Sequence, residues 1–192
     1  MAAERSLEML MEGNARFVGG NTLSGEGTDS RSKETLEEQS PFAAILACSD
    51  SRVPPELIFD SGIGDLFVIR VAGNIADDVV TGSIEYAASH LGVPLVVVLG
   101  HTGCGAITAV LSGACGEGHT GSIRELLAPA LEEIDGQGSG AVEAGARLNA
   151  LRTARLLENS EPVLRPLVES GRLEIRAAMY DLGSGRVEII DR

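Results

Sequence analysis

The sequence predicts an α/β fold in which a mostly parallel β-sheet is flanked by helices, with an N-terminal helical arm and a C-terminal edge hairpin. Short runs rich in Val, Ile and Leu alternate with longer amphipathic segments along most of the 192 residues. The apolar runs are nearly continuous, which is typical of strands that are buried on both faces of a parallel sheet. The chain is long enough for one domain with its own core.

The N-terminal part predicts a helix followed by a loop. Apolar residues recur at helical spacing over residues 6–18, and we expect Gly13 to interrupt this helix. Residues 19–40 are polar and Gly-rich, as loops are. We therefore divide the chain into an arm, 1–40, that packs on the domain or on a neighbouring subunit, and a single α/β domain, 41–192.

The rest of the chain alternates strands with helices and ends in a hairpin. We expect Thr81 to cap the helix that begins there and Gly92 to end it. A turn at 183–185 joins the last two strands, which can add an antiparallel edge to the sheet. The expected strands lie at 42–48, 65–73, 94–100 and on both sides of the turn within 173–190, and the expected helices at 81–92, 104–113, 122–134, 141–159 and 163–171.

Composition and charge exclude several classes of function. The net charge is −13 and no basic cluster modifies it, so the chain has no broad field that would attract nucleic acid or an anionic membrane. No segment approaches the roughly 18 apolar residues that span a bilayer. The charged start is unlike a signal peptide. Three cysteines form an odd set, which disfavours disulfides and favours metal binding or catalysis in a cytoplasmic protein.

Side chains that bind metals follow two of the predicted strands. The stretch CSDSR places Cys48, Asp50 and Arg52 at alternate positions after the first strand. The stretch HTGC places His101 and Cys104 after the third strand. Functional groups gather at the carboxyl ends of parallel strands. Two thiolates and an imidazole with a vacant fourth position are typical of a catalytic zinc site rather than a structural one.

Each motif alone has a simpler interpretation. A cysteine at a strand end is usually a small buried hydrophobe, and an H-x-x-C pair also arises by chance. The convergence of both motifs favours a metal site. In an extended segment Cys48, Asp50 and Arg52 face one way, so the carboxylate and the thiolate could reach one metal. Arg52 would then keep Asp50 ionised through a bidentate bond.

Six stretches match the motifs of a known enzyme family in order. Four are strong, CSDSRVPPE, GDLFVIRVAGN, GSIEYAASHLGV and LGHTGCGAITAV, and the terminal stretches LMEGNARFVGG and MYDLGSGRVEII are weaker. On these motifs the chain resembles the β-class carbonic anhydrases over nearly its whole length. The combination of C-x-D-x-R with H-x-x-C is highly specific to that family.

The resemblance implies a carbonate dehydratase, a lyase that hydrates carbon dioxide reversibly to bicarbonate and a proton. The family uses hydroxide generated at one Zn²⁺ per chain. Cys48, His101 and Cys104 are the implied zinc ligands, and Asp50 and Arg52 the implied catalytic dyad. In a closed form of the family's site, Asp50 itself occupies the fourth position on the zinc.

The resemblance also implies substrate-binding residues and partners. Gln39 matches a glutamine that hydrogen-bonds the substrate oxygen, Phe67 and Tyr86 match an apolar wall, and Gly105 supplies a backbone N–H near the zinc. The family forms homodimers or higher homo-oligomers with active sites at subunit interfaces. The expected partners are therefore carbon dioxide, bicarbonate and further copies of this chain, with no nucleic acid and no membrane.

Some residues depart from the family or invite other interpretations. Val71 replaces an asparagine of the family's RNxxN motif. Ile45 stands where a subgroup with a non-catalytic bicarbonate site has tryptophan, so that site is not implied even though Arg70 matches. Cys115 and His119 lie in a Gly-rich stretch that predicts a surface loop rather than a second metal site.

Two alternative functions stay open at this point. The family scaffold also supports hydrolysis of carbonyl sulfide or carbon disulfide. A non-catalytic zinc protein used in assembly is a further class, although such a protein would not need the Asp50–Arg52 dyad. His90 is expected to be a helix-end residue rather than a proton shuttle.

Overall fold

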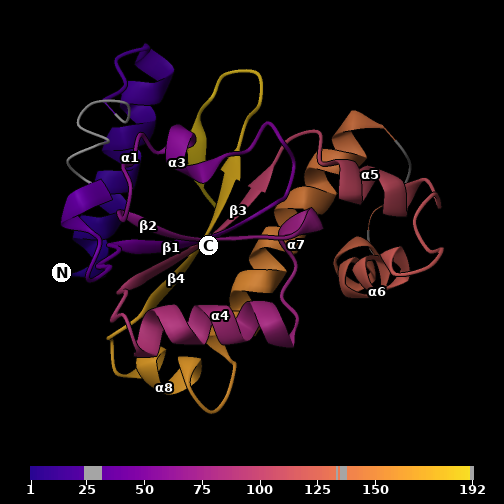
Figure 1. Ribbon diagram of the computed structural model, residues 1–192. Helices are drawn as coiled ribbons and strands as arrows, with labels where there is room; N and C mark the ends of the chain where they lie inside the picture. The colour runs from indigo at the N-terminus through magenta and orange to yellow at the C-terminus, as the bar shows by residue number, and fades with distance from the viewer. Residues whose placement is uncertain (24–31, 133, 135–137, 191–192) are drawn as a thin grey trace.

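The computed structural model describes residues 1–23, 32–132, 134 and 138–190. Its centre is a five-stranded sheet in the order β2-β1-β3-β4-β5 (Figure 1). The pairs β2–β1, β1–β3 and β3–β4 are parallel, and β5 runs antiparallel to β4. The predicted fold class and its edge hairpin are thus confirmed. The strands are β1 (Ala43–Ala47), β2 (Leu66–Arg70), β3 (Leu95–His101), β4 (Glu174–Tyr180) and β5 (Val187–Ile189).

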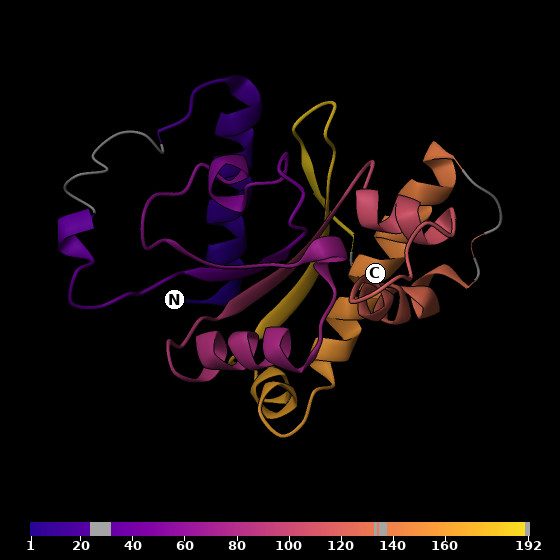
Figure 2. The same ribbon diagram turned by 45° about the vertical axis from the view of Figure 1, so that its right-hand side comes forward.

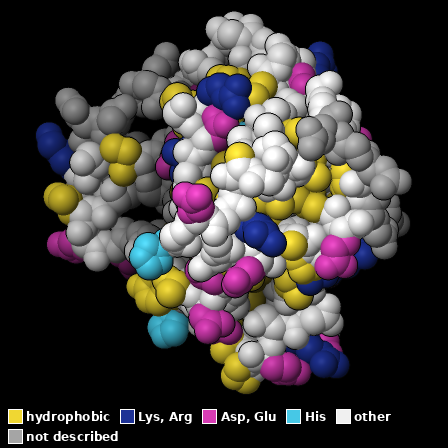
Figure 3. Space-filling view, turned by 90° about the vertical axis from the view of Figure 1, so that its right-hand side faces the viewer, with side chains coloured by type: hydrophobic (Ala, Val, Ile, Leu, Met, Phe, Trp, Pro, Cys, Tyr) yellow, Lys and Arg dark blue, Asp and Glu magenta, His cyan; other side chains and the backbone are white. Residues whose placement is uncertain are grey.

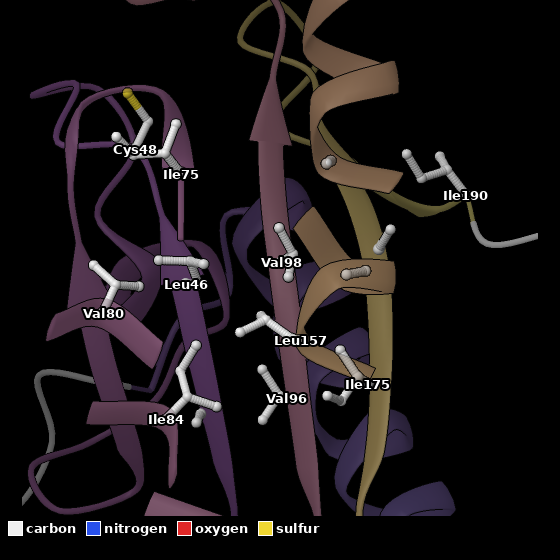
Figure 4. Packing of buried hydrophobic residues seen from close by; sticks show 14 of the residues in the cluster. Leu46, Cys48, Ile75, Val80, Ile84, Val96, Val98, Leu157, Ile175 and Ile190 are labelled. Carbon is white, nitrogen blue, oxygen red and sulfur yellow. The ribbon is translucent and has the colours of Figure 1, made fainter. Parts of the chain in front are cut away.

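Helices cover both faces of the sheet (Figures 1 and 2). On one face, Leu10 of α1 lies in a buried cluster with Ile45 and Val97. On the other face, Leu46 and Val98 cluster with side chains of α4, α7 and α8 (Figure 4). The helical elements are α1 (Ala3–Gly19), α3 (Pro55–Ile58), η1 (Ala72–Asn74), α4 (Asp78–Ser89), α5 (Gly105–Leu111), α6 (Thr120–Leu131), α7 (Ser139–Glu158) and α8 (Leu164–Glu169).

The alternation of side chains along β1 decides which face receives Cys48. Ala43, Ile45 and Ala47 belong to the cluster under α1, whereas Leu46 belongs to the cluster on the opposite face. Cys48 continues the second set and lies above Leu46 in Figure 4. The sulfur therefore lies on the face that carries α4 and α7.

Helix α1 is continuous, so the predicted interruption at Gly13 is wrong. Gly13 lies in the middle of the helix and is buried. A Cβ atom there would collide with the carbonyl oxygen of Phe59. The glycine allows the helix to approach the end of α3 closely and does not break the helix. The loop expected over 19–40 lies partly outside the described residues, and residues 32–34 are helical.

Short elements and one cap also differ from the prediction. Helix α4 begins at Asp78 rather than at Thr81, because the carboxylate of Asp77 accepts the N–H of Val80 at 2.8 Å and caps the helix there. Gly92 follows the helix end with a φ of +67°, as expected of a glycine that ends a helix. The elements α3 and η1 have only four and three residues, too few to show a period in the sequence.

Surface charge and helix hydropathy bear on the expected partners. On the face drawn in Figure 3, basic side chains are scattered among acidic ones. Among the described residues, no helix is long and apolar enough to cross a membrane.

Candidate metal centre

Three side chains that bind metals meet at one edge of the sheet. Cys48 follows β1, His101 is the last residue of β3, and Cys104 precedes the first residue of α5. Parallel pairing sets Ala47 opposite Leu99, so the two strand ends bring Cys48 beside His101. One ligand atom from each of the three residues lies within 4.8 Å of the others, and all three residues are buried.

The imidazole of His101 has the tautomer that a metal ion requires. Its Nδ1 lies 2.9 Å from the carbonyl oxygen of Thr102, which can only accept, so Nδ1 carries the proton. Nε2 is buried without a hydrogen-bond partner among the described residues. An unpartnered buried nitrogen destabilises the fold, and a metal ion bonded to Nε2 would remove that cost. The residues at this site therefore fit a metal ion.

Backbone N–H groups point at both sulfur atoms. Gly73 donates to Cys48 Sγ at 3.3 Å, and Ala106 and Ile107, at the start of α5, donate to Cys104. A hydrogen bond from Cys104 lowers the pKa of Cys48, and the same bond raises the pKa of Cys104. A divalent cation bound to both sulfurs would take the place of the proton in that bond.

Asp50 and Arg52 form a bidentate ion pair next to the three ligands. Arg52 donates from Nε to Asp50 Oδ1 at 2.9 Å and from Nη2 to Oδ2 at 2.8 Å, and its backbone N–H adds a bond to Oδ1 at 3.0 Å. These bonds hold the pKa of the Asp50 carboxyl well below its usual range. Nη2 also reaches the carbonyl oxygen of Gly103, at 3.3 Å, between the two metal-binding residues of the second strand end.

The Asp50 carboxylate does not join the group of ligand atoms that lie within 4.8 Å of one another. It faces Arg52 instead, which is the arrangement expected of an open site. Its occupation of the metal in a closed form stays a prediction.

The four residues matched to the substrate pocket are spread over the chain. Gly105 is the first residue of α5 and adjoins Cys104. The rings of Phe67 and Tyr86 lie 6.1 Å apart. However, Phe67 pairs with Ala44, four residues before Cys48, which is about 13 Å along the strand.

Gln39 also lies away from the ligands of its own chain. It is exposed and precedes β1 by four residues, at the opposite end of that strand from Cys48. In Figure 2 the segment before β1 lies toward the left edge of the molecule. Within one chain, the structure therefore brings Gly105 to the ligands but leaves Gln39, Phe67 and Tyr86 apart from them.

The remaining cysteine and the two remaining histidines do not belong to the group of Cys48, His101 and Cys104. Cys115 donates from Sγ to the carbonyl oxygen of Thr120 at 3.2 Å, and His119 is exposed beside α6. His90 lies at the end of α4 and stacks on Tyr86 with ring centroids 5.1 Å apart.

Two residues that sequence reasoning did not place in the site hold its backbone. Arg70 donates from Nε to the carbonyl oxygen of Cys48 at 3.2 Å and from Nη2 to that of Asp50 at 2.6 Å. Asn149 donates to the carbonyl oxygen of Gly73 at 2.7 Å. The position of Arg70 at the end of the strand beside β1 was a usable signal, whereas nothing near Asn149 in the sequence marks it.

Comparison with known proteins gives one consistent result. A family model described as carbonic anhydrase matches residues 43–187. A carbonic anhydrase of Mycolicibacterium smegmatis is 38% identical over 184 residues, which are 94% of this chain and 89% of that protein. A structure of tetrameric β-carbonic anhydrases from Sordaria macrospora superposes with a TM-score of 0.78, at 26% identity and 98% coverage of both chains. The β-carbonic anhydrase CafA of Aspergillus fumigatus gives a TM-score of 0.75, at 31% identity, and covers 87% of this chain and 85% of that chain.

Proposed function

This chain belongs to the β-carbonic anhydrase family, and from that premise we propose that it catalyses the reversible hydration of carbon dioxide to bicarbonate and a proton at a zinc ion. The observation that carries the proposal is the meeting of Cys48, His101 and Cys104 beside the Asp50–Arg52 ion pair. The triad supplies a metal site, and the ion pair supplies a carboxylate that does not protonate near neutral pH.

The donor set favours zinc among the common metals. Two thiolates and one imidazole suit a borderline-soft ion that accepts tetrahedral geometry. Three protein ligands leave one position open, as catalytic zinc sites do. When bound, zinc supplies a Lewis acid that makes water far more acidic than in bulk solvent.

Asp50 and Arg52 would then orient the reacting water. A carboxylate with a depressed pKa only accepts hydrogen bonds, so Asp50 selects the orientation in which a water proton points at it. Arg52 fixes the direction of the carboxylate through the bidentate bond. Carbon dioxide carries no net charge, so an apolar wall with a hydrogen-bond donor is sufficient to bind it.

We propose that Gln39, Phe67 and Tyr86 serve the site of a neighbouring copy. They lie away from the ligands of their own chain, and Tyr86 is 44% exposed although its ring lies tilted against Phe67 and stacks on His90. Strand β2, which carries Phe67, is at an edge of the sheet. The relatives from Sordaria macrospora are tetrameric, which supports self-association of this chain.

Location and domain organisation complete the proposal. All three cysteines are free, and thiolate ligands persist best in a reducing compartment, so we propose a cytoplasmic location. Residues 41–192 are proposed as the catalytic domain and residues 1–40 as its arm. The similarity to carbonic anhydrases does not favour hydrolysis of carbonyl sulfide or carbon disulfide, nor a non-catalytic zinc protein.

Metal content and carbon dioxide hydration together test the proposal. Purified protein should hold about one zinc per chain, and Cys48→Ser or Cys104→Ser should lose most of it together with stopped-flow hydration activity. Carbonyl sulfide and carbon disulfide are assayed beside carbon dioxide. Full zinc retention in both variants would refute the ligand assignment, and turnover of a sulfur analogue without turnover of carbon dioxide would refute the substrate.

A further inference from the structure

We infer that Asn149, on α7, is a positioning residue for the metal centre, because its amide fixes the turn at Gly73 whose N–H donates to the Cys48 sulfur. The inference rests on the metal site proposed above and adds to it a residue that is not itself one of the proposed ligands. Asn149 is only 2% exposed. Its buried amide therefore acts on the protein interior and not on solvent.

Two consecutive hydrogen bonds connect α7 to the sulfur atom of Cys48. Asn149 Nδ2 donates to the carbonyl oxygen of Gly73 at 2.7 Å, and the N–H of Gly73 donates to Cys48 Sγ at 3.3 Å. The three residues come from α7, from η1 and from the end of β1. Helix α7 packs across the sheet (Figure 1), so the amide belongs to one of the rigid parts of the fold.

Gly73 is a residue that needs such a restraint. Its φ is +75°, in the left-handed region that glycine adopts without strain. A Cβ at this position would come within 3.1 Å of Leu127 and 3.3 Å of Ala106. Any other residue would be strained there, and glycine has more backbone freedom than any other residue. The bond from Asn149 limits that freedom at the residue whose N–H donates to the Cys48 sulfur.

A hydrogen bond to a coordinating thiolate changes how the thiolate binds its metal. Partners of the ligands orient the donor atom and set its basicity, and their loss typically costs about 10- to 100-fold in metal affinity or activity. Without the Asn149 amide, the carbonyl of Gly73 loses its buried donor, and the turn is free to move its N–H away from Cys48. The expected result is a site that binds its metal ion more weakly and whose Cys48 thiolate is easier to oxidise.

The test compares two buried asparagines on opposite faces of the sheet. Asn149→Leu keeps the branching of the side chain and removes the amide. Asn14→Leu is the matched control, because Asn14 is also buried and donates to the carbonyl oxygens of Ile58 and Gly185, away from the ligands. Zinc affinity is measured by competition with a chelator, and the Co²⁺-loaded proteins are compared by their thiolate-to-cobalt charge-transfer band.

We expect Asn149→Leu to bind zinc about 10-fold more weakly or worse, with the charge-transfer band at longer wavelength because a thiolate that loses a donor is easier to oxidise. Asn14→Leu should lower the free energy of unfolding but leave both metal readouts as in the wild type. Unchanged affinity and band in Asn149→Leu, or equal changes in both variants, would overturn the inference.

A second variant guards against a failure to fold. Asn149→Ser is smaller and its hydroxyl is too short to make the same bond. If neither variant folds in excess zinc, as judged by circular dichroism, Asn149 serves the fold and the inference is wrong. The site itself is tested separately: zinc retained in Cys48→Ser refutes the site, whereas zinc lost there but normal metal binding in Asn149→Leu refutes only the role of Asn149.

Discussion

The Arg52→Ala substitution tests what the guanidinium contributes to the Asp50 carboxylate. It removes the bonds of 2.9 and 2.8 Å to Asp50 and the bond of 3.3 Å to the Gly103 carbonyl oxygen, and it leaves the backbone bond of 3.0 Å to Asp50. Loss of a partner that orients a group at a metal site typically costs about 10- to 100-fold in activity. The Arg52 side chain is 56% exposed, and solvent screening weakens such an ion pair, so we expect a loss at the lower end of that range.

This range gives the expected loss of rate. Because the orientation of Asp50 matters mainly in the transition state, Arg52→Ala should lose about 10-fold in kcat/KM. The deficit should widen as the pH falls, because Arg52 holds the pKa of Asp50 down and its removal lets that pKa rise. Stopped-flow hydration of carbon dioxide against pH measures both effects, with zinc content determined on the same samples.

Two further variants make the result specific. Arg52→Lys keeps the charge but not the planar fork, so it should fall between the wild type and Arg52→Ala. Arg165→Ala removes an arginine of similar exposure that pairs with Glu169 at 2.8 Å, and it should leave hydration unchanged. A zinc-loaded Arg52→Ala with wild-type kcat/KM at every pH would refute the reasoning.

Three other predictions follow from the same structure. Cys115→Ser should leave zinc content and hydration unchanged, and a large loss of either would place the 115–119 loop in the site. Gly13→Ala should lower the free energy of unfolding by about 1–3 kcal/mol because its Cβ meets the Phe59 carbonyl. Gly82→Ala is the control: it has open space at its Cβ and should be neutral or stabilising by up to about 1 kcal/mol. Equal urea midpoints for the two variants would contradict this prediction. Removing zinc with a chelator should lower the thermal midpoint, and added zinc should restore it, since a ligand of the native state stabilises that state; an identical midpoint with and without zinc would argue against the site.

The sequence was most informative where the structure depends on local pattern. Nearly continuous apolar runs identified the parallel strands, and the residues directly after two of them supplied Cys48, His101 and Cys104. These three meet because carboxyl ends of neighbouring parallel strands share one edge of a sheet. The fold class and the meeting of these three side chains could therefore be predicted together.

Features that depend on distant partners could not be predicted in this way. Glycine is a residue type that often interrupts helices, and only the position of Phe59 shows that Gly13 instead lets α1 approach the end of α3 closely. Asn149 binds a backbone carbonyl that is 76 residues away in the sequence, and such an acceptor leaves no mark in the sequence. The cap at Asp77 was missed because Thr81 offered an equally good residue type four positions later.

The separation of Gln39 from the ligands of its own chain leads to a last prediction, that it acts on a neighbouring copy. Gln39→Ala should lose about fivefold in hydration, the value of one neutral hydrogen bond of about 1 kcal/mol, and should keep its zinc. Cys48→Ser should be inactive but should retain an intact Gln39. Mixing the two proteins under mild denaturant, and then removing it, produces hybrid assemblies.

In a hybrid with two-fold symmetry, each subunit meets the partner's surface. If Gln39 acts across the interface, a Gln39→Ala subunit receives an intact glutamine from its Cys48→Ser partner. Random pairing gives such a partner to about half of those subunits, so the hydration rate of the mixture should rise about threefold over that of the unmixed proteins. A mixture of Gln39→Ala with the double variant Gln39→Ala/Cys48→Ser is the control and should show no rise. Native mass spectrometry establishes whether hybrids form. If they form and the rate does not rise, Gln39 does not act on the neighbouring site. The placement of Phe67 and Tyr86 at that site would then also be unsupported.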